Sequence, residues 1–155
     1  MLLLLFQIGD DKYAIDSVQV VEIIPQIPFR KVYQAPKHVA GVFNYRGKIV
    51  PAIDLCYLIS GRASSNCLST RIIMVNYPLP DGQNRYLGLI AEQVTDTVHK
   101  RDSDLMPTEL PSDRAGYLGE MISESQGMIQ RLRVDKLLSD SQQTWLLPEN
   151  RSELI

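Results

Sequence analysis

The sequence predicts an all-β fold made mainly of short strands, with only brief helical turns between them. Apolar runs of about four to eight residues, rich in Val, Ile, Leu and Tyr, recur along the whole chain and are separated by Gly, Pro or Asp. A faint internal repeat sorts these runs into two similar groups. Helical signals are confined to single turns, such as the N-cap pattern at Asp16. Together these observations predict two small β lobes in one folded unit.

The predicted strands follow the apolar runs in chain order. They cover residues 2–8, 13–15, 20–24, 41–45, 48–53, 71–77, 86–91, 97–100, 118–122 and 128–134. Pro51 lies inside one of these runs, and a proline lacks the backbone donor that a central strand needs. We therefore expect an edge position or a bulge at Pro51.

The internal repeat relates residues of the first half to residues about 76 to 81 positions later, a drift that insertions in surface loops explain. Matching positions include Gly41 with Gly119 and Gly47 with Gly127; chance similarity is the alternative explanation. A lobe of about 75 residues buries too little surface to be stable alone, so we expect a shared hydrophobic core. The prediction is one domain at 1–145, with the chain crossing between lobes near 60–68, and a C-terminal tail at 146–155.

Composition and charge restrict the possible partners. The chain has 155 residues, a formal net charge of -2 and a pI near 5.7, whereas proteins that bind the phosphate backbone usually carry a basic excess. Nucleic acid is therefore not expected as a partner. No apolar run approaches the roughly 20 residues of a membrane-spanning helix, and the apolar start meets Asp10 and Asp11 too early for a signal peptide. We expect a cytoplasmic protein that does not insert into a membrane.

The residues that usually carry catalysis do not form a recognisable motif. His38 and His99 are the only histidines, and neither lies in a setting typical of a nucleophile and base pair. Cys56 and Cys67 are too far apart in sequence for a CxxC metal site, and no glycine cluster suits a phosphate. We expect no enzyme activity, no metal and no cofactor. A hydrolase built from residues distant in the sequence is the least favoured of the functions considered.

Two charged residues are candidates for partner recognition. Residues 41–55 predict a hairpin with Arg46 and Gly47 at its turn, because glycine accepts the positive φ that such turns need. Arginine is enriched at interface hot spots, although a solvent-exposed turn charge is the alternative. Glu22 interrupts a run of four β-branched residues and must face water or a partner. Its alternative role is to discourage pairing at a sheet edge.

These motifs occur together in a specific order along the chain. They are Phe6-Gln7-Ile8-Gly9, Tyr13-Ala14-Ile15-Asp16, Val20-Val21-Glu22-Ile23-Ile24, Ala35-Pro36, the stretches 41–47 and 49–55, and in the second half 87–94, 117–119, 128–129 and 134–138. In this order the chain closely resembles the CheW-like chemotaxis coupling proteins, from about residue 2 to about residue 140.

The resemblance implies a fold and a function. The fold is a pair of five-stranded, SH3-like β barrels around a shared hydrophobic core. The function is that of a non-catalytic adaptor, which joins the cytoplasmic tip of a methyl-accepting chemoreceptor to the regulatory domain of a CheA-type histidine kinase. The alternative is a small β-barrel module that binds RNA, a peptide or a ligand outside chemosensory signalling.

The resemblance also implies which residues contact partners. Arg46 matches the arginine of the family's Asn-x-Arg-Gly turn, so Asn44, Arg46 and Gly47 are expected to act in coupling. Glu22 matches a glutamate associated with kinase contact. Three further positions match residues linked to receptor or kinase binding, namely Val20, Gly41 and Ile72.

The chain departs from the family pattern at a few positions. Tyr45 stands where the family commonly has Leu, and Gln130, Arg131 and Arg133 make the last strand more polar than usual. These departures leave open the partner of the second lobe. They also leave open whether the pathway controls flagella, pili or surface sensing.

Overall fold

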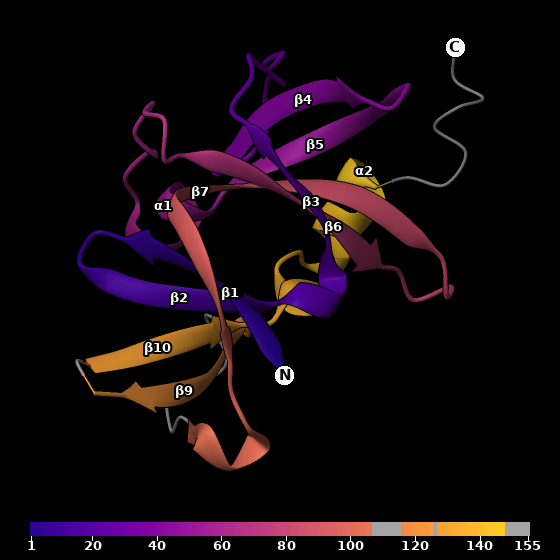
Figure 1. Ribbon diagram of the computed structural model, residues 1–155. Helices are drawn as coiled ribbons and strands as arrows, with labels where there is room; N and C mark the ends of the chain where they lie inside the picture. Colours follow the sequence, from indigo (N-terminus) through magenta and orange to yellow (C-terminus); the bar gives the residue numbers. More distant parts are fainter. Residues whose placement is uncertain (107–115, 126, 148–155) are drawn as a thin grey trace.

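The computed structural model describes residues 1–106, 116–125 and 127–147, and is mainly β (Figure 1). The strands are β1 (Leu2–Ile8), β2 (Asp11–Asp16), β3 (Val20–Pro25), β4 (Val39–Tyr45), β5 (Lys48–Asp54), β6 (Arg71–Pro78), β7 (Asn84–His99), β8 (Leu105–Met106), β9 (Leu118–Glu124) and β10 (Gly127–Leu132). The α-helices are α1 (Leu55–Ser60) and α2 (Asp140–Leu146), and the 3₁₀ helices are η1 (Ser17–Gln19), η2 (Asp102–Asp104) and η3 (Val134–Lys136).

The strands form two lobes that share β7. The central lobe contains β3, β4, β5, β6 and the first half of β7, which pairs with β6 over residues 84–91. The terminal lobe contains β1, β2, the second half of β7, β8, β9 and β10. Because β1 and β2 come from the N-terminus and β8 to β10 from the C-terminal third, the terminal lobe is completed by distant parts of the chain.

The two lobes repeat one pattern of strand pairing. In the central lobe, β6 pairs antiparallel with β3 and β7, β4 pairs antiparallel with β5, and β5 runs parallel to β7. In the terminal lobe, β1 pairs antiparallel with β7 and β2, β9 pairs antiparallel with β10, and β10 runs parallel to β2. The predicted all-β fold of two similar five-stranded lobes is therefore confirmed, with the two-residue β8 as an addition.

The expected crossing point near residues 60–68 is wrong. These residues connect α1 to β6, and both of these elements belong to the central lobe. The chain crosses instead at η1 and within β7, which passes from one lobe into the other as one strand of 16 residues (Figure 1). The polar residues at 60–68 form a surface loop within the central lobe. The crossing within β7 lies near Gln93, where the backbone has a positive φ of 49°. The two strands predicted at 86–91 and 97–100 are both parts of β7.

The C-terminal boundary also differs from the prediction. The helix α2 ends at Leu146, and Leu146 and Leu147 are both buried in the main hydrophobic core. The packed unit therefore extends at least to residue 147, because these two side chains are part of that core. The remainder of the predicted tail, 148–155, lies outside the described residues.

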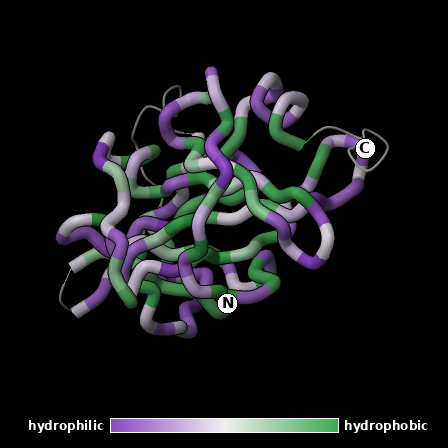
Figure 2. Tube along the Cα trace, turned by 90° about the horizontal axis from the view of Figure 1, so that it is seen from above, coloured by the Kyte–Doolittle hydropathy of each residue, from purple (hydrophilic) through white to green (hydrophobic). Residues whose placement is uncertain are grey.

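A shared core joins the two lobes, as expected. The largest cluster of buried side chains draws Leu4 and Ile15 from the terminal lobe and Ile53 and Leu87 from the central lobe. Hydrophobic residues follow the inner segments of the chain while polar residues occupy the outer loops (Figure 2). Each fully buried aliphatic side chain contributes about 1.5–3 kcal/mol to stability, so this cluster opposes separation of the lobes.

Pro51 lies at a point where one side of β5 has no partner strand, which agrees with the predicted edge position. It pairs with Val42 of β4, whereas the parallel pairing of β5 with β7 starts at Ala52. At Pro51, β5 therefore pairs with β4 alone, and the missing backbone donor leaves the ladder with β7 intact.

Candidate partner-binding site

The turn between β4 and β5 has a fixed geometry. Arg46 and Gly47, its two central residues, have φ values of 51° and 81°, and two positive φ values define a type I′ turn. The side chain of Asn44 accepts a hydrogen bond from the backbone N–H of Gly47 at 3.0 Å. The predicted hairpin is confirmed, and Arg46 is held at its tip with 56% of its side chain exposed.

Glu22 and Arg46 come together although they lie on opposite ends of the central sheet. The strand order β3-β6-β7-β5-β4 places β3 at one end and β4 at the other. Backbone hydrogen bonds of 2.9 Å between Arg30 and Val42 bring the segment after β3 against β4. The sheet thus curls toward a barrel, and Arg46 Nη2 lies 3.6 Å from Glu22 Oε2.

Tyr45 completes the cluster. Its hydroxyl donates a hydrogen bond to Glu22 Oε1 at 2.6 Å, and the Arg46 guanidinium lies 5.0 Å from the centre of its ring. Burial and then the hydrogen bond to the Glu22 carboxylate raise the pKa of Tyr45 to about 12. The hydroxyl therefore remains a proton donor at neutral pH. We call Glu22, Tyr45 and Arg46 the turn cluster.

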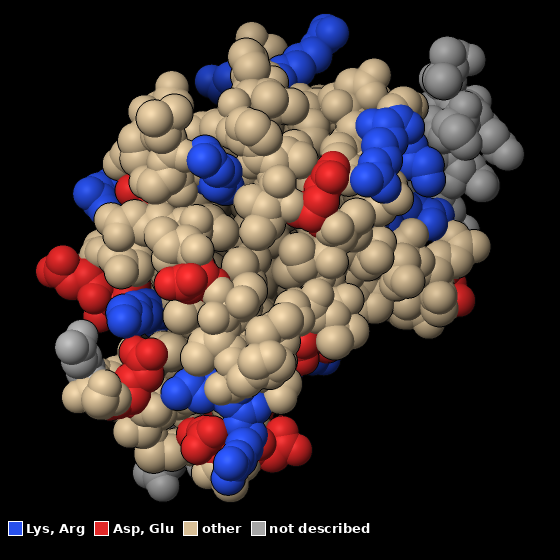
Figure 3. Space-filling model, viewed as in Figure 1, with Lys and Arg blue, Asp and Glu red and all other residues tan. Residues whose placement is uncertain are grey.

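A second aromatic ring supports the turn cluster. Tyr86 of β7 packs edge-on against Tyr45 with ring centres 5.2 Å apart, and Lys48 Nζ lies 5.5 Å from the centre of the Tyr86 ring. Arg46 thus makes a cation–π contact with Tyr45 and Lys48 makes one with Tyr86, and the two rings are nearly perpendicular. Figure 3 shows Lys and Arg side chains gathered at the upper right of the view, toward the β4–β5 turn, with an acidic side chain close by.

The structure does not bring all of the expected residues into this exposed cluster. Val20 is half-buried and pairs with Val75, and Ile72 is fully buried between Ile24 and Ile90. Ile72 therefore has no surface with which to touch a partner. Gly41 is also buried, with a φ of 151°, and a Cβ at this position would lie 2.4 Å from the backbone oxygen of Arg30. Ile72 belongs to the same buried cluster as Tyr45, Gly41 lies in β4 beside Arg30, and Val20 packs against the main core.

Sequence reasoning missed the contributions of Tyr45, Lys48 and Tyr86. Tyr45 was visible only as a departure from the family pattern. A signal was present, because Phe43 and Tyr45 alternate in β4 and so point to the same face. The contact with Tyr86 could not be read from the sequence, since it depends on how β7 pairs within the sheet.

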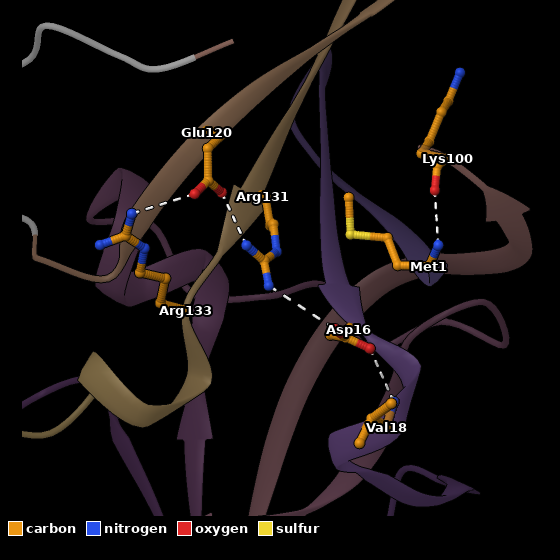
Figure 4. A network of polar contacts seen from close by, with 7 residues as sticks. All are labelled: Met1, Asp16, Val18, Lys100, Glu120, Arg131 and Arg133. Carbon is orange, nitrogen blue, oxygen red and sulfur yellow. Dashed lines mark hydrogen bonds and ion pairs between the residues drawn. The ribbon is translucent and has the colours of Figure 1, made fainter. Parts of the chain in front are cut away.

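The terminal lobe carries a separate network of charged residues (Figure 4). Glu120 of β9 accepts hydrogen bonds from Arg131 at 2.9 Å and Arg133 at 3.3 Å, and Arg131 Nη2 lies 3.8 Å from Asp16. Asp16 also caps η1 by accepting a hydrogen bond from the N–H of Val18 at 3.1 Å. The polar residues that depart from the family pattern thus connect the β9–β10 hairpin to the crossing at η1.

Competing effects set the pKa of Glu120 in this network. Burial raises the pKa, but hydrogen bonds from its own backbone N–H and from Arg131 outweigh burial, so the pKa of Glu120 lies below its ordinary value. Glu120 is therefore ionised at neutral pH and pairs with both arginines.

Cys56 and His38, two of the residues considered for catalysis, make contacts within the fold. The buried thiol of Cys56 donates a hydrogen bond to Glu92 at 2.8 Å, and burial followed by this bond raises its pKa to about 12. Such a thiol is a poor nucleophile. The ring of His38 faces Gln142 at 3.4 Å. Within residues 1–106, 116–125 and 127–147, no group of three or more His, Cys, Asp or Glu side chains could hold a metal ion.

A comparison with known families assigns the chain. The family model described as "CheW-like domain" matches residues 2–142. This chain belongs to the CheW-like family. The resemblance identified from the sequence motifs is thereby confirmed.

Individual CheW relatives agree with this assignment. The chain is 28% identical over 134 residues to the chemotaxis protein CheW of Helicobacter pylori, covering 86% of this chain and 78% of that protein. It is 29% identical over 141 residues to the chemotaxis protein CheW of Klebsiella aerogenes, covering 90% and 82%. The crystal structure of the scaffolding protein TtCheW from Thermoanaerobacter tengcongensis superposes with a TM-score of 0.77 at 22% identity, covering 89% and 87%, which establishes a common fold.

No helix in the part of the chain that the structure describes is long and apolar enough to span a membrane.

Proposed function

We propose that this chain is a non-catalytic adaptor that couples the cytoplasmic tip of methyl-accepting chemoreceptors to the regulatory domain of a CheA-type histidine kinase. The family match and the relatives confirm that it is a chemotaxis coupling adaptor. We further infer that it has no catalytic activity and acts in the cytoplasm. A binding module for RNA, a peptide or a ligand is not favoured by these matches.

The turn cluster is the observation that carries the proposal. Interface hot spots are enriched in arginine and tyrosine, and preorganised side chains lose little entropy on binding. Arg46 fits this description because a type I′ turn fixes its backbone and the Tyr45 ring supports its guanidinium. Glu22 adds an acceptor beside it, half-exposed at the surface. We therefore assign partner contact to Glu22 and Arg46.

The other residues named by the resemblance support this surface in different ways. Asn44 is exposed and caps the turn through the Gly47 N–H, so it can both contact a partner and hold the turn. Gly41 permits the close approach of Arg30, and Ile72 fills the interior under β3. In the proposal, Gly41 and Ile72 influence binding through the shape of the sheet.

Replacing Arg46 tests the proposed function. Arg46→Ala is expected to weaken binding to at least one of two probes, a receptor tip fragment and the kinase regulatory domain, by about 5- to 150-fold. Calorimetric titration against each probe measures the effect. Arg62→Ala, in the exposed loop after α1, is the matched control and leaves both affinities unchanged. Unchanged affinity of Arg46→Ala for both probes would remove the turn cluster from the proposal.

A further inference from the structure

The carboxylate of Glu22 makes its shorter contact with Tyr45, not with Arg46. The Tyr45 hydroxyl lies 2.6 Å from Oε1, within the range of a charge-assisted O–H···O⁻ hydrogen bond. Arg46 Nη2 lies 3.6 Å from Oε2, which is beyond hydrogen-bond distance. Two neighbours thus compete for one carboxylate, and the phenol occupies the better geometry.

This competition matters because a carboxylate and a guanidinium readily form a two-pronged pair. Such a bidentate pair uses both carboxylate oxygens and two N–H groups of the arginine. In this chain one oxygen is already engaged by Tyr45, and the guanidinium lies over the Tyr45 ring at 5.0 Å. The N–H groups of Arg46 consequently stay at the surface, with 56% of the side chain exposed.

We propose that Tyr45 is a positioning residue, which holds Glu22 out of a bidentate pair with Arg46 and so keeps the guanidinium open to a partner. The assignment of a partner to Arg46 rests on the proposed function, whereas the competition for Glu22 does not. The Tyr45 hydroxyl binds Glu22 and the Tyr45 ring lies beside the Arg46 guanidinium, so this one side chain tunes how strongly Arg46 binds.

Chemical modification of Arg46 measures its availability without any partner. Phenylglyoxal modifies exposed arginines, and peptide mass spectrometry gives the rate at Arg46. Tyr45→Phe keeps the ring and removes the hydroxyl, so Glu22 turns to Arg46 and the rate falls about threefold or more. Tyr45→Phe combined with Glu22→Gln restores the original rate, because the competing negative charge is gone.

Tyr86→Phe is the matched control, because Tyr86 lies in the same aromatic contact and the structure gives it no hydrogen bond to Glu22. It leaves the Arg46 rate unchanged. An unchanged rate in Tyr45→Phe would overturn the proposal, and so would a slower rate that Glu22→Gln fails to restore. Thermal unfolding of each variant, expected within a few degrees of the parent, shows that the fold persists.

Affinity measurements with the two probes distinguish a failure of the Tyr45 positioning role from a failure of the proposed partner site. Tyr45→Phe is expected to lower the affinity for whichever probe depends on Arg46 by about 3- to 10-fold. The affinity is expected to recover when Tyr45→Phe is combined with Glu22→Gln. If Arg46→Ala binds both probes normally while the modification rates change as expected, the positioning role stands and the proposed site fails. If Arg46→Ala weakens binding while Tyr45→Phe changes neither the rate nor the affinity, only the positioning role fails.

Discussion

The hydroxyl of Tyr77 in β6 donates a hydrogen bond to the backbone carbonyl of Asp135, 3.0 Å away and 58 residues later in the chain. The same oxygen accepts hydrogen bonds of 3.3 Å from Leu138 N–H and from the side-chain amide of Gln143. Tyr77 is fully buried, so it fixes the segment from η3 to α2 against the central lobe from inside the core.

Removing this hydroxyl is expected to destabilise the fold without touching the partner site. Tyr77→Phe leaves the buried N–H of Leu138 and the partly buried carbonyl of Asp135 without this partner, which costs about 1–3 kcal/mol of unfolding free energy. Urea unfolding measures the loss. Tyr33→Phe, at a side chain that is 79% exposed, is the control and leaves stability unchanged. Equal stability of the two variants would mean that Tyr77 does not anchor the C-terminal segment.

Gly41 is expected to tolerate no side chain. In Gly41→Ala the new Cβ would lie 2.4 Å from the backbone oxygen of Arg30, and the two hydrogen bonds between Arg30 and Val42 hold this segment against β4. The expected loss is about 2–4 kcal/mol.

Gly9→Ala provides the comparison for Gly41→Ala. Gly9 also has a positive φ, 61°, but no atom lies within 4 Å of its added Cβ. Its loss is expected near 1 kcal/mol, from backbone strain alone. The difference between the two variants in thermal unfolding measures the extra cost at Gly41, which combines the clash with Arg30 and the strain of an alanine at a φ of 151°; equal losses would show that no clash occurs.

The network around Glu120 predicts a dependence of stability on pH. The pKa of Glu120 is lower in the folded than in the unfolded chain, so its contribution is present above the unfolded pKa and is lost as the pH falls through the folded pKa. Glu120→Gln should therefore lose up to about 1 kcal/mol at pH 7 and approach the parent below about pH 4.

Urea unfolding at a series of pH values checks this dependence. Asp96→Asn, at an exposed position of β7 in the same lobe, serves as the control for the loss of one carboxylate, and the effect of Glu120→Gln is compared with it at each pH. A difference between Glu120→Gln and the parent that is constant from pH 7 to pH 3 would contradict the role of the charge.

The sequence predicted the fold class and the turn because these depend on local patterns. Alternating apolar residues mark the strands, and Arg46-Gly47 between two such runs marks the turn. The repeat predicted two lobes, but it could not show that β1 and β2 complete the lobe built from the C-terminal third. That arrangement depends on the bend of β7 near Gln93, where no glycine or proline marks the crossing.

The candidate site was predictable only in part for a similar reason. Arg46 and Glu22 are conspicuous as charges next to apolar neighbours, and both lie in the turn cluster. The sequence around Ile72 does not tell whether its side chain lies at the surface or in the core. Its complete burial follows from the pairing of β6 with β3 on one side and β7 on the other. The hydrogen bond from Tyr45 to Glu22 joins two ends of a curled sheet, which no short-range pattern encodes.

The most direct test of the central claim is a reconstituted kinase assay. Receptors in vesicles and a CheA-type kinase are mixed with or without this chain, and kinase autophosphorylation is measured as the receptor ligand is added. The account predicts that the ligand controls the kinase only when the chain is present, and that Arg46→Ala weakens this control. Equal control of the kinase in the absence of the chain would contradict the account.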